Sequence, residues 1–211
     1  MSKSIDFNSN IIQELGNNIK ILQETNKNLQ LKNDQLIKEN KQIKMEVKEL
    51  KESVIELKQY SRRTNLEISN LPEKENEDLK EVLTKIQQVS NSDFVADIAI
   101  AHRIPTYNKD KPKPIIVQFK SKESRDKNLK ILKACKLNAS TINPRFNDSP
   151  VYVNEHLAPE LKTLFFEARK TRIEKQYKFC WVRDGKIFLR KNESSRVIRI
   201  KSNDDLNIQN D

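Results

Sequence analysis

The first sixty residues place apolar side chains at a strict seven-residue period. With Ile12 at heptad position a, every d position is leucine or isoleucine through seven heptads, and three consecutive a positions are asparagine. This pattern predicts a coiled coil, in which asparagine at a fixes the register and favours two parallel strands. The a and d residues expected at the oligomer seam are Leu15, Ile19, Leu22, Asn26, Leu29, Asn33, Leu36, Asn40, Ile43, Val47, Leu50, Val54 and Leu57.

Charge pairs give independent support for a parallel coil. From g to the following e position, Glu39 meets Lys44 and Glu46 meets Lys51, the spacing of interhelical ion pairs between parallel partners. We expect a flexible N-terminus over 1–10, a coiled coil over 11–61, and a parallel dimer, with a trimer as the alternative.

After the coil, the pattern changes to short alternating runs and amphipathic helices. The expected order is strand, helix, strand, strand, helix, strand, at 65–70, 72–90, 98–103, 115–119, 121–136 and 151–153. This order is the split βαβ pattern of RNA-recognition motifs. The sequence therefore predicts a domain of that kind over 62–154, with a basic, proline-rich loop at 105–114.

The strand faces indicate how this domain would contact a nucleic acid. Alternation places Ile100 and His102 toward the core and Arg103 on the open sheet face. Glu67 occupies a position where a base-stacking aromatic residue is expected, and the basic-glycine-aromatic signature is missing. We therefore expect this face to contact phosphates rather than bases.

The residues from 155 to 202 predict a second small domain, a helix beside an antiparallel sheet. Pro159 opens the helix, and Asp184-Gly185 is a two-residue hairpin signal. The resulting register puts an aliphatic face toward the helix and leaves Trp181 and Phe188 among cations on the far face. These rings either form a platform for single strands or pack as core against the first domain. A third strand follows at 196–201, and a disordered tail is expected over 203–211. The complete fold class is α+β.

Charge is concentrated in the two expected domains. The formal net charge is +10, and the segments 101–136 and 162–201 are strongly basic, as expected of a polyanion binder. Solvated lysine-rich helices are the alternative explanation. The candidate nucleic-acid-binding residues are Arg62, Arg63, Arg103, Lys109, Lys111, Lys113, Lys120, Trp181, Arg183, Lys186, Phe188, Arg190 and Arg196.

Other function classes find little support in the composition. Two glycines leave no glycine-rich phosphate loop, and two cysteines and two histidines lack the spacing of metal ligands. No carboxylate pair or nucleophile-base pair stands at useful spacing, so we expect no enzyme, cofactor or metal. The absence of a signal core or an apolar span of membrane length predicts an intracellular protein of the cytoplasm, the nucleus or both.

Several motifs in order carry a family resemblance. From Arg62 to Lys201 the chain resembles the baculovirus few-polyhedra (FP) protein family and the related C-terminal domains of insect retroelements. The stretches that carry it are 63–68 (RTNLEI), 101–103 (AHR), 151–157 (VYVNEHL), 177–190 (YKFCWVRDGKIFLR) and 195–197 (SRV). The order of coil, split βαβ unit and small C-terminal domain is also similar to the first-open-reading-frame protein of LINE-type retrotransposons, a resemblance that implies a trimeric nucleic-acid chaperone.

Together these features predict an oligomer that binds single-stranded RNA or DNA with low sequence specificity, as a coating or chaperone protein of viral or retroelement origin. The alternative is a structural adaptor in viral assembly or occlusion that acts through protein-protein contacts.

Overall fold

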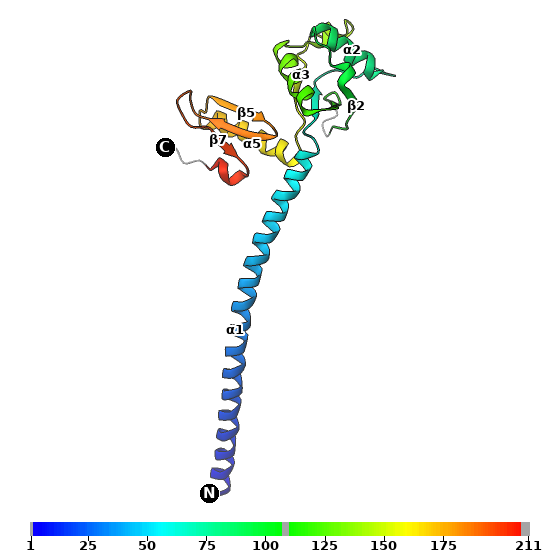
Figure 1. Ribbon diagram of the computed structural model, residues 1–211. Coiled ribbons are helices and arrows are strands. Elements are labelled where there is room, and N and C mark those ends of the chain that lie inside the picture. The colour runs from blue at the N-terminus through cyan, green and yellow to red at the C-terminus, as the bar shows by residue number, and fades with distance from the viewer. Residues whose placement is uncertain (1, 107–109, 208–211) are drawn as a thin grey trace. The chain divides into compact units, whose positions relative to one another are not determined.

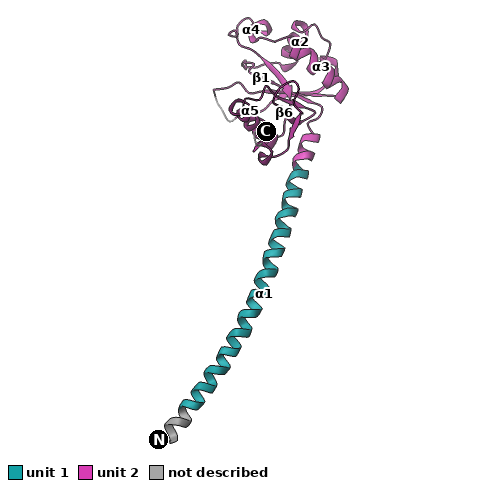
Figure 2. Cartoon of the chain, turned by 90° about the vertical axis from the view of Figure 1, so that its left-hand side faces the viewer, with its two compact units in different colours: residues 1–54 teal, residues 55–211 magenta. Residues whose placement is uncertain are grey.

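A computed structural model of the protein describes residues 2–106 and 110–207. The chain divides into two compact units, residues 1–54 and 55–211 (Figure 2). Lys109, one of the candidate binding residues, lies outside the described residues.

A single long helix, α1 (Ser2–Tyr60), accounts for the N-terminal quarter of the chain (Figure 1). The helix begins at Ser2, so it includes most of the segment 1–10 that the sequence predicts to be flexible. The apolar a and d side chains lie exposed along the helix, with Leu22 at 67% and Leu57 at 69%. A long helix is thus confirmed, while its assembly into a coiled coil stays a prediction.

The next elements form a split βαβ unit. They are β1 (Asn65–Ser69), α2 (Leu79–Val89), a 3-10 turn (Val95–Asp97), β2 (Ile98–Arg103), β3 (Ile115–Phe119), α3 (Lys122–Ala134), α4 (Ala139–Ile142) and β4 (Tyr152–Glu155). The strands make an antiparallel sheet in the order β2-β3-β1-β4. The predicted element order is confirmed, and the short helix α4 is an addition within a stretch that showed no periodicity.

Capping residues begin the two long helices of this unit. The side chain of Asp78 accepts the backbone N–H of Lys80 at 2.8 Å, and the Ser121 hydroxyl accepts that of Ser124 at 3.1 Å. Each cap satisfies a backbone donor that the helix itself leaves unpaired. The helices then pack on one sheet face in a core that includes Leu66, Val117 and Phe119.

A bulge in β2 reverses the predicted facing of its last residues. The register against β3 shifts between Ile98 and Ile100, after which Ala101 pairs with Val117 and His102 with Ile116. An extra residue moves every following side chain to the opposite face. Ile100 and His102 are consequently exposed, and Arg103 turns inward, contrary to the sequence prediction.

The C-terminal elements form a second layered structure. They are α5 (Pro159–Glu174), β5 (Phe179–Arg183), β6 (Lys186–Arg190), β7 (Ile198–Ile200) and a 3-10 helix, η2 (Asn203–Leu206). Strands β5, β6 and β7 make an antiparallel sheet in that order. Its aliphatic face packs on α5 in a second core containing Leu164, Ala168, Ile187, Leu189 and Ile200, as the hairpin register predicts.

The beginning of the expected disordered tail is ordered. Ser202 and Asp205 form a capping box around η2, and Leu206 is buried in the second core. The prediction of disorder is therefore wrong for 203–206, because one apolar side chain anchors a segment whose composition is otherwise polar.

Candidate nucleic-acid interface

The outer face of the β5–β6 hairpin presents two stacked aromatic rings. The turn at Asp184-Gly185 has positive φ at both residues, 53° and 68°, as a type I′ hairpin requires. Trp181 therefore pairs with Phe188, and their ring centroids lie 5.5 Å apart with 24° between the ring planes. Both rings are half-buried and belong to neither hydrophobic core. The core interpretation of these rings thus finds no support in the packing.

Exposed cations lie at the hairpin turn beside this aromatic pair and in the loop before β7. Arg183 and Lys186 are exposed at the turn, and Arg196 is exposed in the loop before β7. Arg190 instead donates to the carbonyl oxygens of Ser195 and Glu193, so its guanidinium holds the 191–196 loop. The face therefore combines rings with exposed cations, the composition of a single-strand binding surface.

One cation of this face, Arg199, is absent from the binding residues that the sequence predicts. Arg199 in β7 pairs with Phe188 in β6, so Trp181, Phe188 and Arg199 form one row across three strands, and Arg199 is exposed. The alternating pattern of β7 predicts this position of Arg199 when the hairpin register is continued from β6 to the third strand. We name the surface made by Trp181, Arg183, Lys186, Phe188 and Arg199 the platform.

The other candidate cations lie in the split βαβ unit and in the short segment between α1 and β1. Lys111 is exposed, Lys113 is exposed and pairs with Glu73 at 3.1 Å, and the Lys120 amine donates to the Ala96 carbonyl at 2.8 Å. Arg62 donates to the Lys58 carbonyl, and Arg63 stacks over the Tyr60 ring at 3.8 Å. These cations belong to several different elements.

Arg103 has a structural role in place of the predicted phosphate contact. Its guanidinium forms a bidentate pair with Glu77, at 2.6 and 2.8 Å, and both side chains are 8% exposed. It also donates to the carbonyl oxygens of Leu71, Pro72 and Lys113. These hydrogen bonds connect the end of β2, where Arg103 lies, to the loop before α2 and to the end of the basic loop.

The open face of the four-stranded sheet is partly covered by the segment that follows β4. Asn65 contacts the His156 ring at 3.4 Å, and Glu67 forms an ion pair with Lys162 of α5 at 2.6 Å. Ile116, which pairs with Glu67 on this face, is 1% exposed. This part of the sheet, where an RNA-recognition motif would stack bases, is therefore closed by the chain itself.

The hairpin turn is held against the first sheet's end. The Glu155 carboxylate accepts the backbone N–H groups of Asp184 and Gly185 at 3.0 and 2.7 Å. Lys122 pairs with Asp184 at 2.8 Å, which lowers the pKa of Asp184 and raises that of Lys122. A Cβ on Gly185 would lie 2.5 Å from Cγ of Gln59, and the residue has φ +68°, so a larger residue there would strain the backbone and force the turn or the Gln59 side chain to shift.

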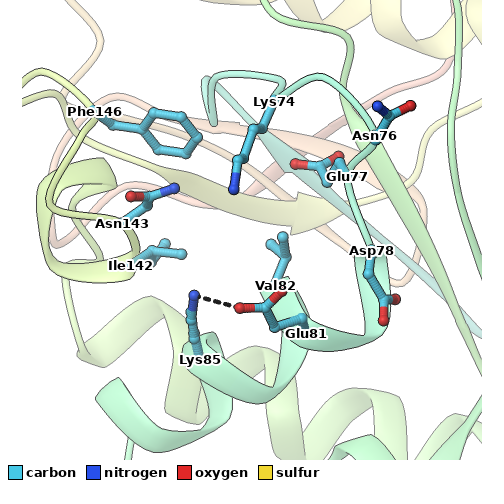
Figure 3. A pocket seen from close by; sticks show the side chains of 10 residues that line it. All are labelled: Lys74, Asn76, Glu77, Asp78, Glu81, Val82, Lys85, Ile142, Asn143 and Phe146. Carbon is cyan, nitrogen blue, oxygen red and sulfur yellow. Dashed lines mark hydrogen bonds and ion pairs between the residues drawn. The ribbon is translucent and has the colours of Figure 1, made fainter.

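A small cavity of about 90 Å³ lies beside α2 and α4. Figure 3 shows the amine of Lys74 pointing into it, opposite Lys85, which pairs with Glu81 at 2.7 Å. The remaining walls include Val82, Ile142 and Phe146. Its volume is well below the roughly 300 Å³ or more typical of ligand pockets, so it does not suit a nucleotide.

Neither a metal centre nor a membrane span is found in the part of the chain that the structure describes. Over residues 2–106 and 110–207, no three His, Cys, Asp or Glu side chains gather as metal ligands would. Among the helices of those residues, none combines the length and apolar composition needed to cross a bilayer.

Burial predicts a pH-dependent stability through His156. Burial, and then the charges of Arg62 and Lys162, lower the pKa of His156 to about 4. The unfolded chain keeps a pKa near 6.5, so between pH 6.5 and 4 it binds more protons than the folded chain. We expect the free energy of unfolding to fall as pH decreases through this window, by at most about 1.4 kcal/mol per pH unit from this group.

Urea unfolding at pH 7, 5.5 and 4 measures this effect. His156→Gln, which cannot titrate at this position, should reduce the pH dependence of the free energy of unfolding. A His156→Gln variant with the same pH dependence as the parent would show that another group is responsible.

Comparison with known proteins supports one part of the predicted resemblance. Residues 158–208 match the family described as "Baculovirus FP protein domain 2". No curated protein sequence matches the chain. A solved structure entitled "SXL-LETHAL PROTEIN/RNA COMPLEX" is similar at a TM-score of 0.28 and 16% sequence identity, and the likeness covers 45% of this chain and 48% of that one. The structural likeness is weak and extends over about half of that protein. The segment from α5 to η2, which carries the platform, is therefore similar to the second domain of the baculovirus FP proteins.

Proposed function

We propose that the protein is an oligomeric nucleic-acid-binding protein that prefers single strands, has low sequence specificity, and acts by coating or chaperoning rather than by catalysis. The platform is the observation that carries this proposal. Its stacked rings lie outside both cores and have exposed cations on the neighbouring strands.

The chemistry of the platform favours unpaired bases of any kind. Every base has a π-face that can stack on an aromatic ring, whereas bases in a duplex are already stacked. Arg183, Lys186 and Arg199 can contact phosphates, which carry no sequence information directly. The proposed ligand is therefore single-stranded RNA or DNA, read mainly through its backbone and its flat bases.

Oligomerisation through α1 completes the proposal. The exposed apolar seam of α1 needs a partner to be removed from water, and a second copy offers the same seam in register. Linking several platforms raises their effective concentration on one strand. We infer a parallel dimer, with a trimer as the alternative, that gains affinity by avidity.

The similarity to an FP domain fits a viral or retroelement origin, which we include in the proposal. The match spans α5 and the three strands of the platform. This match supports the proposed evolutionary origin only. The proposal of nucleic-acid binding depends on the platform.

Replacing Trp181 by alanine tests the platform. We expect the free energy of single-strand binding to weaken by about 1–3 kcal/mol, the typical loss for one stacked base. The stability should change little, because the ring belongs to neither core. Fluorescence anisotropy with a labelled oligonucleotide and a thermal melt on the same preparation measure the two quantities.

Two results would contradict the proposal that the platform binds single strands by stacking. A Trp181→Ala variant that loses about 3–5 kcal/mol of stability would show that the ring is core. Normal oligonucleotide affinity in a stable variant would show that charge alone binds the strand. Arg199→Gln is the companion variant, expected to weaken binding without destabilising the exposed edge of the sheet.

Salt dependence tests the electrostatic part. If a protomer neutralises about five or six phosphates, log affinity for a single strand should fall with log salt at a slope of about −4. Replacing Lys111 and Lys113 by glutamine should reduce the slope by about 0.7 for each phosphate that the variant leaves without a cation. An affinity that does not change between about 50 and 200 mM salt, or no binding at about 100 mM, would contradict the proposal.

A further inference from the structure

The outer face of α5 carries two large apolar side chains that no part of the described chain covers. Phe166 is 67% exposed and Ile173 is 68% exposed, more than any other large apolar residue beyond α1 in the part of the chain that the structure describes. They are seven residues apart, so they lie on the same side of the helix, about 10 Å apart along its axis. Single exposed apolar residues are common, but Phe166 and Ile173 share one side of a helix, where a single partner element could cover both.

The helix holds this pair in a fixed position. The opposite stripe of α5 packs in the second core through Leu164 and Ala168, which are 7% and 0% exposed. Pro159 stands in the first turn and stabilises the start of the helix. The exposed face is therefore preorganised, and a partner would not have to order it.

The charges beside the pair identify the kind of partner. At about 100° per residue, Lys170 lies on one side of the line from Phe166 to Ile173, and Arg169 on the other. Both cations are exposed, and neither forms a salt bridge with another described residue. Two copies of this face would bring like charges together, which opposes self-association.

We propose that this face, Phe166, Arg169, Lys170 and Ile173, docks an acidic amphipathic helix of another protein. Leucine-like side chains of the partner, two turns apart, would cover Phe166 and Ile173, and glutamate or aspartate beside them would pair with Arg169 and Lys170. An aliphatic side chain such as Ile173 cannot stack on a base, which favours a protein over a nucleic acid at this site. The surface is separate from the platform and would recruit a partner to an assembled protein.

A synthetic helical peptide tests the site on the full-length protein. The fluorescein-labelled probe has leucines two turns apart flanked by glutamates, and a second peptide carries lysines in place of the glutamates. We expect the glutamate peptide to bind at least about tenfold more tightly than the lysine peptide. Phe166→Ser with Ile173→Ser should weaken this binding by about tenfold or more, and Arg169→Glu with Lys170→Glu should reverse the preference between the peptides.

The controls separate this site from the platform. Trp181→Ala should bind the glutamate peptide normally, and the Phe166/Ile173 variant should bind the labelled oligonucleotide normally, with an unchanged thermal melt. If the serine variant fails to fold, the charge-reversal variant still decides the question.

Three outcomes would overturn the proposal. The first is equal or undetectable binding of the two peptides by the parent protein. The second is loss of oligonucleotide affinity in the Phe166/Ile173 variant, which would assign the face to nucleic acid. The third is a smaller oligomer of that variant in light scattering, which would make another copy of the chain the occupant.

Discussion

Replacing Arg103 by alanine is expected to lower the free energy of unfolding by about 3–5 kcal/mol, the usual cost of removing one partner from a buried ion pair. The loss has two causes. The Glu77 carboxylate, 8% exposed, would remain buried without its counter-charge, and the carbonyl groups of Leu71 and Pro72 would lose a charged donor. Urea unfolding followed by circular dichroism measures the change.

An exposed ion pair in the same region provides the control. Lys113→Ala removes the pair with Glu73, whose side chains are 51% and 41% exposed, and should cost about 1 kcal/mol or less. If Arg103→Ala were as stable as the parent but bound oligonucleotide poorly, Arg103 would be a phosphate ligand after all. Arg103→Lys should restore little of the lost stability, because lysine cannot form a bidentate pair with Glu77.

Disrupting the α1 seam is expected to reduce single-strand affinity by about 100-fold to 10,000-fold, the range by which linked sites exceed single ones. Leu29→Glu with Leu36→Glu places carboxylates at two d positions, which should leave the protein monomeric. Light scattering and anisotropy on the full-length protein give the oligomeric state and the affinity together. The platform of each protomer should remain intact, so weak binding should persist at high protein concentration.

The matched control adds the same charge outside the seam. Asn28→Glu with Gln35→Glu alters two c positions of the same heptads, and these positions point away from the partner helix. This variant should form the same oligomer as the parent and bind the oligonucleotide with only slightly lower affinity, because its net positive charge is smaller. A monomeric parent protein, or an oligomeric Leu29/Leu36 variant, would show that α1 does not assemble the protein.

Much of the fold follows from local patterns. The heptads predict the long helix, and alternating runs between amphipathic stripes predict the βαββαβ order, because these depend on periods of a few residues. The Asp184-Gly185 turn predicts the whole hairpin register, since a two-residue type I′ turn allows one pairing. Local patterns failed where one residue changed the outcome, at the bulge in β2 and at Leu206 beyond the last strand.

The sequence by itself determined the platform's two rings and most of its cations, because hairpin pairing is local. Only the tertiary structure decided that Arg103 is part of a buried ion pair, since its partner Glu77 lies 26 residues earlier in the chain. It alone decided that His156 and Lys162 cover the first sheet's open face and that Phe166 stays exposed. The reason is physical: alternation predicts which side chains share a face, but which segment covers that face depends on packing between distant parts of the chain.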